Sequence, residues 1–426
     1  MRRSWVFGEL LPTLFERMGA GKPHDDTRTL AELSEALLSA EGEVSGYKLA
    51  ATVLDRYRAA GDIEKLAFFD YLNAQLDLDP LLLAELAQAY AQNPTPTAYQ
   101  TLTRAAEPRR QELLRRLNQP VGATQLLVAM RTDLLRFLKS KPELARTDQD
   151  FVHLLRSWFN RGFLVLEQIY WSTPATILDK IVAYEAVHQI DDFEALRRRL
   201  APPDRRCFAF FHPSMPGEPL IFVEVALTSG IPGSIDDLLS EDRAPIALET
   251  ATTATFYSIS NCQKGLAGIS FGNLLIKQVV TELSQEFPHL STFVTLSPIP
   301  GFASWLTSQE AKDAVGPVDN LSDEAFSRLV AHYLMATKTQ DGRVRDPVAR
   351  FHLGNGAEIH KIHLRADLSE NGMQQSCGTM VNYHYDLSRS ERNHEAFASR
   401  GEIAASHEVE ALLAKHIELI DKKKIA

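Results

Sequence analysis

Ser297 stands at a place in the sequence where a hydroxyl group could reach a substrate. It lies in the segment LSPIPGF (296–302), between a run typical of a strand and a run typical of a helix. The carboxyl end of a strand is where α/β sheets place their ligands. A serine before a proline is also a good helix N-cap, and the segment does not match the G-x-S-x-G motif of α/β-hydrolases. The residues alone favour capping and leave a catalytic role open.

His352 is a second residue with possible chemistry. It lies in ARFHLGNGA (349–357), which predicts a helix that ends at a glycine. In the last turn of a helix the dipole favours the charged imidazolium. The residues alone favour a structural histidine over one that transfers protons. His360 and His363 follow, but their spacing is not that of a zinc site, so the sequence predicts no metal.

Three glycines, Gly265, Gly268 and Gly272, join a predicted strand (255–260) to a predicted helix that begins near Ile269 or Ser270. Glycine lets the backbone approach a ligand closely, and the free N–H groups of a helix start bind anions such as pyrophosphate. The spacing matches neither the dinucleotide-binding fingerprint nor the P-loop. A tight turn with close packing of helix on sheet explains the glycines equally well.

The composition limits the class of protein that could carry these residues. The chain has 426 residues, 45% of them hydrophobic, which is enough for roughly two or three packed domains. No uncharged apolar run approaches the roughly 18 residues of a membrane span. The net charge of −10 argues against a dedicated nucleic-acid binder. We therefore predict neither a membrane nor a nucleic acid as a partner.

The cysteines and the N-terminus bear on the compartment. Cys207, Cys262 and Cys377 form an odd, sparse set with no C-x-x-C pair, which is typical of a reducing compartment and predicts a cytoplasmic protein. The first residues are basic and then apolar, but Glu9 and Glu16 interrupt them early. An amphipathic first helix is therefore favoured over a targeting peptide.

The first half of the chain has the pattern of helices. Apolar residues recur at spacings of three and four, as at Leu30, Leu33 and Leu37, and Thr29 is a plausible cap. No strand-like alternation appears before about residue 200. The arginines of segment 104–146 alternate with acidic residues, which favours a solvated, salt-bridged helix face. We predict an α-helical domain over residues 1–150.

After residue 203 the pattern changes to strands mixed with helices. The predicted strands are 207–212, 220–227, 255–260 and 292–297, and the predicted helices are 274–283, 302–314, 323–336 and 402–421. This order predicts a mixed α/β domain over residues 151–426.

Several stretches together resemble the malonyl-CoA decarboxylase family. They are FFHPSMPGEPLIFVEVALTSGIPGSI (210–235), FYSISNCQKGLAGISFGNLLIK (256–277), FPHLSTFVTLSPIPGF (287–302), ARFHLGNGA (349–357) and SCGTMVNYHYDL (376–387). The resemblance extends from about Trp171 to the C-terminus, and the segment EAVH (185–188) also fits. The pairing of LSPIPGF with FHLGNGA is its most specific feature.

The resemblance implies an α+β protein. An all-α N-terminal domain would precede a catalytic domain resembling the GNAT acetyltransferase fold. The family's serine corresponds to Ser297, its histidine to His352, and a further histidine to His188. Some relatives have a glutamate where this chain has Ser270, so any acidic role there is absent or moved. The CoA-binding loop corresponds to Ala267, Gly268, Ile269, Ser270, Phe271, Gly272 and Asn273.

The reaction implied by the resemblance is the decarboxylation of malonyl-CoA to acetyl-CoA and CO2. The thioester carbonyl is itself the electron sink, so no metal or organic cofactor is expected. We expect Ser297 to contact the malonyl carboxylate and to relay a proton, with His352 as the proton reservoir. Asn382, Tyr383 and Tyr385 would line the acyl pocket or simply pack at a strand end.

Two other functions stay open at this point. The same fold and ligand would serve an acyl-CoA-dependent N-acyltransferase, in which the serine and histidine are incidental. A non-catalytic acyl-CoA sensor would bind without turnover. In each case the helical domain is the expected surface for a homo-oligomer.

Overall fold

The computed structural model describes residues 27–269, 272–309, 311 and 321–425. Its contacts divide the chain into two compact units. The first comprises Met1–Leu164, His212–Pro216 and Gln263–Ile269, and the second Val165–Phe211, Gly217–Cys262 and Ser270–Ala426. The helix predicted at the start of the chain lies outside the described residues. The predicted domain limits, 1–150 and 151–426, stay a prediction.

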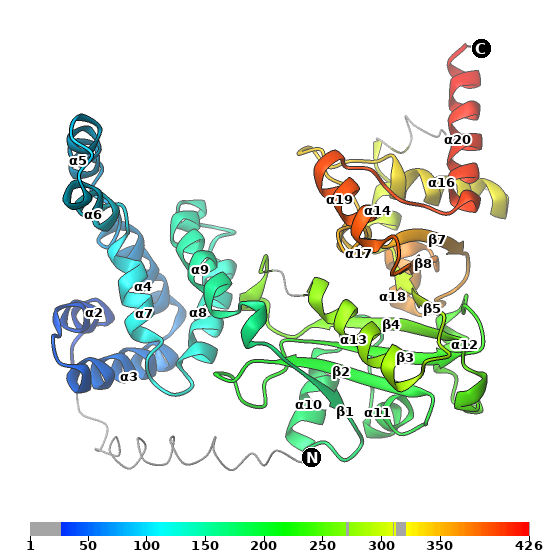
Figure 1. The fold of residues 1–426 in the computed structure, drawn as a ribbon, viewed down its shortest axis with the longest axis horizontal. Helices are drawn as coiled ribbons and strands as arrows, with labels where there is room; N and C mark the ends of the chain where they lie inside the picture. The colour runs from blue at the N-terminus through cyan, green and yellow to red at the C-terminus, as the bar shows by residue number, and fades with distance from the viewer. Residues whose placement is uncertain (1–26, 270–271, 310, 312–320, 426) are drawn as a thin grey trace. The chain divides into compact units, whose positions relative to one another are not determined.

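Residues 27–164 of the first unit are mainly helical, as their apolar spacing predicts, and appear in blue to teal in Figure 1. Thr29 and Glu32 form a capping box at the first described helix. Asp79 caps another helix, and Pro80 occupies that helix's first position. The α-helices are α2 (Leu30–Ser39), α3 (Glu43–Ala59), α4 (Asp62–Ala74), α5 (Pro80–Gln92), α6 (Pro96–Ala105), α7 (Arg109–Leu117), α8 (Ala123–Phe137) and α9 (Ala145–Trp158). Short 3-10 turns are η2 (Pro142–Leu144), η3 (Arg161–Phe163) and η5 (Lys264–Leu266).

The prediction of a solvated arginine face is wrong for two residues. Arg110 and Arg131 are each only 3% exposed. Arg110 pairs with Asp77 at 2.9 Å and also with Asp150, and Arg131 pairs with Asp148 at 2.8 Å. A buried guanidinium is tolerated only when carboxylates and carbonyls satisfy its donors, and these aspartates supply that compensation.

The second unit is built on one mixed sheet. Its strands are β1 (Val165–Ile169), β2 (Arg205–Phe211), β3 (Ile221–Thr228), β4 (Thr253–Asn261), β5 (Thr292–Thr295), β6 (Ser297–Pro298), β7 (Glu358–His363) and β8 (Met380–His384). Strands β1 to β4 pair antiparallel in chain order, and β5 joins β4 in parallel. Strand β8 then pairs antiparallel with β5, β6 and β7. Strand β1 was not predicted, because five residues at a sheet edge carry too little alternation.

The helices of this unit flank the sheet. They are α10 (Ala175–Tyr184), α11 (Phe193–Leu200), α12 (Ile235–Leu239), α13 (Gly272–Glu286), α14 (Phe302–Leu306), α16 (Asp323–Met335), α17 (Pro347–Leu353), α18 (Glu370–Ser376), α19 (Ser390–Arg400) and α20 (His407–Ile425), with the 3-10 turn η4 (Leu248–Thr250). The predicted helix 302–314 corresponds to a short α14 that ends at Leu306. The predicted helix 402–421 begins later, at His407.

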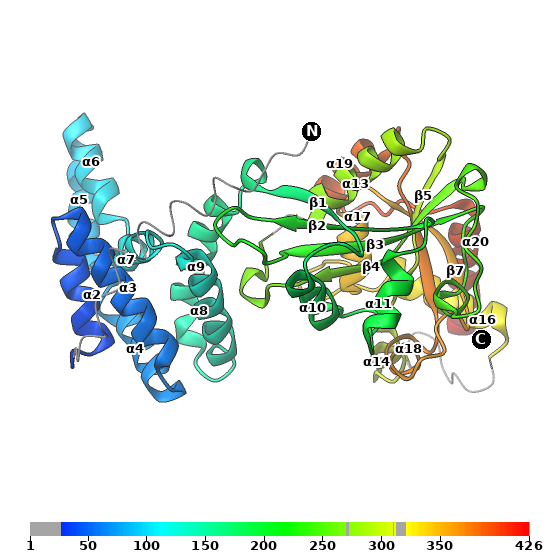
Figure 2. The same cartoon turned by 90° about the horizontal axis from the view of Figure 1, so that it is seen from below.

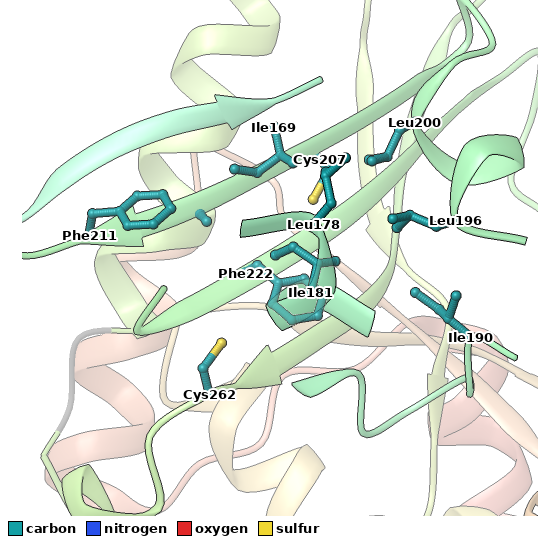
Figure 3. Close-up of a cluster of buried hydrophobic side chains, with 11 residues drawn as sticks. Ile169, Leu178, Ile181, Ile190, Leu196, Leu200, Cys207, Phe211, Phe222 and Cys262 are labelled. Atoms are coloured by element: carbon teal, nitrogen blue, oxygen red, sulfur yellow. The ribbon is translucent and has the colours of Figure 1, made fainter. Parts of the chain in front are cut away.

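A hydrophobic core lies between β1–β3 and the helices α10 and α11 (Figure 3). On β2 the alternate residues Cys207, Ala209 and Phe211 belong to this core. The residues between them therefore face the other side of the sheet. Helix α13 lies on that other side, as Figure 2 shows. The predicted class, a helical part followed by a mixed sheet-and-helix domain, is confirmed. No helix within the described ranges is long and apolar enough to span a bilayer.

Candidate active site

A gap opens where two parallel strands separate. Strands β4 and β5 are paired from Thr253 and Thr292 to Phe256 and Thr295. Beyond that point β4 continues along β3 to Asn261, whereas the other strand resumes as β6 along β8. A cavity of about 370 Å³ lies at this divergence. It is lined by Val187, Phe256, Tyr257, Ile259, Asn261, Ser297, Pro298, Pro347, Val348, Phe351 and His352.

Ser297 is a strand residue and not a helix cap. It opens β6 and pairs with Val381 of β8, while helix α14 begins only at Phe302, after Gly301. The capping role that the residues favoured is therefore wrong. The physical reason is the pair of prolines: a residue before a proline is pushed towards an extended backbone, and this applies both to Ser297 and to Ile299.

The structure brings Ser297 and His352 together, although 55 residues separate them in sequence. Ser297 Oγ lies 3.3 Å from His352 Nε2, and the two residues are 6% and 2% exposed. His352 lies in α17, which begins after the cap Asp346 with Pro347 at its first position and ends at Gly354. The predicted helix ending at a glycine is confirmed.

Tyr383 of β8 and Tyr385, just after the end of that strand, hold the imidazole. His352 Nδ1 lies 2.7 Å from the hydroxyl of Tyr385, and the ring of Tyr383 stacks on the imidazole with centroids 4.5 Å apart. Burial lowers the pKa of His352 to about 3. The imidazole is therefore neutral, with one nitrogen donating and the other accepting. The expectation of an imidazolium favoured by the helix dipole is wrong, because desolvation outweighs the dipole.

Thr295 contacts the serine from the other side. The hydroxyls of Ser297 and Thr295 lie 2.9 Å apart, and Thr295 Oγ1 accepts a hydrogen bond from the backbone N–H of Tyr383 at 3.2 Å. A continuous chain of hydrogen bonds thus runs from Tyr383 N through Thr295 and Ser297 to His352 and on to Tyr385.

Asn382 supports this arrangement from outside the cavity wall. Its side-chain amide donates to the carbonyl of Thr295 at 2.8 Å and to that of Pro232 at 3.3 Å. Its oxygen lies 2.5 Å from His363 Nε2. Asn382 therefore ties the end of β5 to β8, and it is not among the residues that line the cavity.

His188 does not line the cavity, although its neighbour in sequence does. Its side chain is buried, and burial lowers its pKa to about 4. The neighbouring Val187 is the residue that lines the cavity. The carboxylate of Glu185 accepts hydrogen bonds from the backbone N–H groups of both residues, at 2.9 and 2.8 Å, and from the hydroxyl of Ser258 at 2.8 Å. Glu185 thus fastens this segment to β4.

The glycine loop has a packing role in its first part. A Cβ on Gly265 would lie 1.9 Å from the carbonyl oxygen of Val128, so only glycine fits against α8. Gly268 has a φ of +77°, a left-handed conformation that favours glycine. The guanidinium of Arg131 donates to the carbonyls of Gly265 and Ala267 at 2.7 and 2.8 Å.

The rest of the loop is less fully described. The described part of helix α13 runs from Gly272, so its predicted start near Ile269 or Ser270 stays a prediction. Ser270 and Phe271 lie outside the described residues. Asn273 follows Gly272 in α13, and Ile269 closes the described part of the loop with a buried side chain.

Comparison with known proteins places the chain in a family. Residues 162–329 and 318–423 match the model of the malonyl-CoA decarboxylase C-terminal domain, and residues 77–159 match that of the N-terminal domain. The chain belongs to the malonyl-CoA decarboxylase family. The family membership predicted from the sequence is confirmed.

Relatives of this family cover most of the chain. The mitochondrial malonyl-CoA decarboxylase of the goose Anser anser anser is 36% identical over 71% of this chain and 69% of its own length. The crystal structure of malonyl-CoA decarboxylase from Rhodopseudomonas palustris is 51% identical, with a TM-score of 0.83 over 89% of this chain and 98% of the other. That from Agrobacterium vitis is 50% identical, with a TM-score of 0.83 over 90% and 99%.

Three residues of this malonyl-CoA decarboxylase family member were missed by sequence reasoning. Thr295 precedes the serine by two positions, which puts both side chains on one face of an extended segment. That spacing could have predicted a contact between the two hydroxyl groups. Glu185 was named only as the first residue of the segment EAVH, with no role of its own. Arg131 was predicted to lie on a solvated helix face. Their partners lie 73 and 134 residues away in sequence, so no local pattern identifies them.

Proposed function

We propose that this protein decarboxylates malonyl-CoA to acetyl-CoA and CO2 as a carboxy-lyase. Family membership supports the reaction class. The observation that carries the proposal is the buried contact of 3.3 Å between Ser297 Oγ and His352 Nε2 in the wall of a cavity. A hydroxyl and a neutral imidazole supply what this chemistry needs, which is a mobile proton beside the reacting carbon.

The reaction divides into two steps. The bond between the carboxylate carbon and the methylene carbon breaks, CO2 leaves, and the electron pair moves into the thioester carbonyl to form an enolate. A proton then adds to the former methylene carbon, which gives acetyl-CoA. Because the carbonyl accepts the electrons, we propose no metal and no organic cofactor for this step.

The chain of hydrogen bonds supports a proton relay. We propose that Ser297 delivers its proton to the enolate carbon and is reprotonated by His352 Nε2. The hydroxyl of Tyr385, 2.7 Å from Nδ1, returns a proton to the other ring nitrogen and is itself reprotonated from solvent, which supplies the one proton that each turnover consumes. This modifies our expectation of a proton reservoir, because a buried neutral imidazole passes a proton through its ring and does not store one as imidazolium.

The apolar side chains of the cavity favour loss of CO2. Val187, Phe256 and Phe351 line it beside the serine. A carboxylate is poorly solvated among such groups, whereas neutral CO2 is not. As the bond breaks, the negative charge leaves the carboxylate, which lies among these apolar groups. The charge then develops on the thioester oxygen of the enolate.

The open edge of β4 suits the arm of the coenzyme. Beyond Phe256, β4 keeps its partner β3 on one side and no longer pairs with β5 on the other. Amide groups of the pantetheine chain can pair with a strand edge of this kind. We propose residues 267–273 and the start of α13 for the pyrophosphate, since free N–H groups at a helix start bind anions.

An assay without any acyl acceptor tests the proposal. Incubation of the purified chain with malonyl-CoA should release CO2 and acetyl-CoA in equal amounts. An N-acyltransferase would release neither at a comparable rate until an amine is added. A sensor would bind malonyl-CoA, as measured by calorimetry, without turnover. Either of those results would overturn the proposal.

We also propose that the chain forms a homo-oligomer through helices α5 and α6. These helices pack on each other, with the rings of Tyr90 and Tyr99 6.0 Å apart, and neither helix has a buried residue. Leu81 is 84% exposed and Tyr99 55%. Exposed apolar groups gathered on one hairpin are typical of an interface.

The oligomer is tested by light scattering after size-exclusion chromatography. Leu81→Glu combined with Tyr99→Glu should lower the measured mass to that of a smaller assembly. Val44→Glu on α3, at a residue 67% exposed, is the matched control and should leave the mass unchanged. A wild-type chain of monomeric mass would contradict the proposal. Cytoplasmic location and the lack of a nucleic-acid partner remain predictions.

A further inference from the structure

Three potential metal ligands meet on β7 and β8. Glu358 Oε1 lies 3.3 Å from His384 Nδ1 and 3.9 Å from His360 Nδ1. The three ligand atoms all lie within 4.8 Å of one another. Sequence spacing predicted no metal at His360 and His363. The third ligand of this cluster is His384, on the neighbouring strand, and His363 is not part of it because its Nε2 contacts Asn382.

The pairing of the strands produces this cluster. Glu358 and His384 are direct partners across the antiparallel ladder, so their side chains share one face. The register shifts between Ile359 and Lys361, which leaves His360 as the extra residue of a β-bulge. A bulge re-aims a side chain and is common beside functional sites. The bulged residue, His360, therefore contributes one of the two imidazoles of the cluster.

We propose that Glu358, His360 and His384 bind a divalent zinc ion. Two imidazoles and one carboxylate are ligands that zinc accepts, with water in the fourth position. Ligands bound at about 2.0 Å in a tetrahedron lie about 3.3 Å apart. The distance between Glu358 and His384 already has that value, and the distance to His360 exceeds it by 0.6 Å. The ligand atoms of the two imidazoles lie within 4.8 Å of each other, so the His360 ring would move towards the other two ligands when zinc binds.

Two of the ligand atoms, Glu358 Oε1 and His384 Nδ1, are hydrogen-bonded to each other at 3.3 Å, and zinc would replace that bond. The buried atom His360 Nδ1 has no hydrogen-bond partner among the described residues. A buried nitrogen of this kind costs free energy unless something binds it. Arg389 lies 3.4 Å from Glu358 Oε2 and so neutralises the other carboxylate oxygen. Oε1 is thereby left to face the two histidines.

The position of the cluster indicates a structural role. Side chains alternate along a strand, so His384 points away from the face that carries Tyr383 and Tyr385. Those two tyrosines contact the catalytic candidate His352. A metal ion at the cluster would therefore clamp β7 to β8 on the opposite face and would not meet the substrate.

Titration calorimetry with zinc chloride tests the proposal on the full chain after treatment with a chelator. We expect one zinc ion per chain and a higher melting temperature with zinc. His360→Gln and His384→Gln should each weaken binding by about tenfold or more. His153→Gln, at an exposed histidine of α9, and Cys377→Ser should leave the affinity unchanged. Unchanged binding in both ligand variants would overturn the proposal.

X-ray absorption spectroscopy on the wild-type zinc complex keeps the test independent of how the variants fold. The expected spectrum has nitrogen and oxygen neighbours at about 2.0 Å, with the outer scattering of two imidazoles. A shell of sulfur at about 2.3 Å would indicate cysteine ligands and would refute the site. The absence of saturable zinc binding by the wild-type chain would refute it as well.

Discussion

At Ser297 the hydroxyl group has two neighbours that compete for its single proton. His352 Nε2 lies at 3.3 Å and Thr295 Oγ1 at 2.9 Å. A serine that donates to Thr295 leaves its lone pairs facing the imidazole, which is then the donor. The proposed relay requires this arrangement, because it makes His352 the source from which the serine recovers its proton.

Removing either member of the pair should abolish most of the turnover. Ser297→Ala and His352→Ala are each expected to lower kcat by about a hundredfold or more, which is the usual contribution of a positioned acid. The affinity for CoA should stay nearly the same, because neither group is proposed to contact the nucleotide. Steady-state kinetics and calorimetry with CoA measure the two quantities. Full activity in either variant would exclude the pair from catalysis.

Thr295 offers a finer test of the same chain of hydrogen bonds. Thr295→Val keeps the shape but removes the hydroxyl that contacts Ser297, and we expect kcat to fall by about tenfold with KM little changed. Thr295→Ser restores the hydroxyl and should restore most of kcat. Equal rates for the valine and serine variants would show that the contact has no part in positioning Ser297.

At the scale of elements, β8 positions most of the site. Tyr383 of this strand and Tyr385 just after it contact His352, and Asn382 donates to the carbonyl of Thr295. Val381 pairs with Ser297 itself. A single strand thus fixes both the serine and the imidazole, which explains how groups from distant segments meet within hydrogen-bond distance.

Helix α8 should affect the substrate through the glycine loop. Arg131→Met removes the two hydrogen bonds to the carbonyls of Gly265 and Ala267. We expect KM for malonyl-CoA to rise by about tenfold while kcat changes little, because the loop is proposed to bind and not to react. Arg136→Gln, at an exposed ion pair of the same helix, is the control and should leave KM unchanged. An unchanged KM in Arg131→Met, with the fold verified by circular dichroism, would contradict the role of the loop.

At the scale of the whole molecule, buried histidines make stability depend on pH. Burial lowers the pKa of His352 to about 3 and that of His188 to about 4. In the unfolded chain both histidines have a pKa of about 6.5. Below that pH the unfolded state therefore binds protons that the folded state does not. The stability that the two neutral histidines contribute is fully present above about pH 6.5. It is lost as the pH falls from there towards the pKa values of the two histidines in the folded state.

Urea unfolding at pH 7 and pH 5 measures this effect. The loss of unfolding free energy between the two should be smaller in His352→Gln than in the wild type by about 2 kcal/mol. The comparison of variants is needed because Glu224, whose pKa burial raises to about 7, acts with the opposite sign. Equal pH dependence in the two proteins would mean that His352 is not held neutral.

Sequence patterns predicted the elements better than their ends. The strand 220–227 and the helix 323–336 differ from β3 and α16 by a single residue at one or both ends, because their apolar spacing is long and regular. Strand β1 was missed because it is short and lies at an edge. The capping role favoured for Ser297 was wrong because the two prolines keep residues 297 and 299 extended, so the helix begins only at Phe302.

The sequence by itself determined the family and the fold class, since these depend on residue types at fixed local spacing, and through the family resemblance it proposed Ser297 and His352 as a catalytic pair. It did not determine the charge of His352, the role of Arg131 or the cluster of Glu358, His360 and His384. Those depend on burial and on partners from other strands and helices. Desolvation and long-range contacts exist only once the chain is folded, so only the tertiary structure decided them.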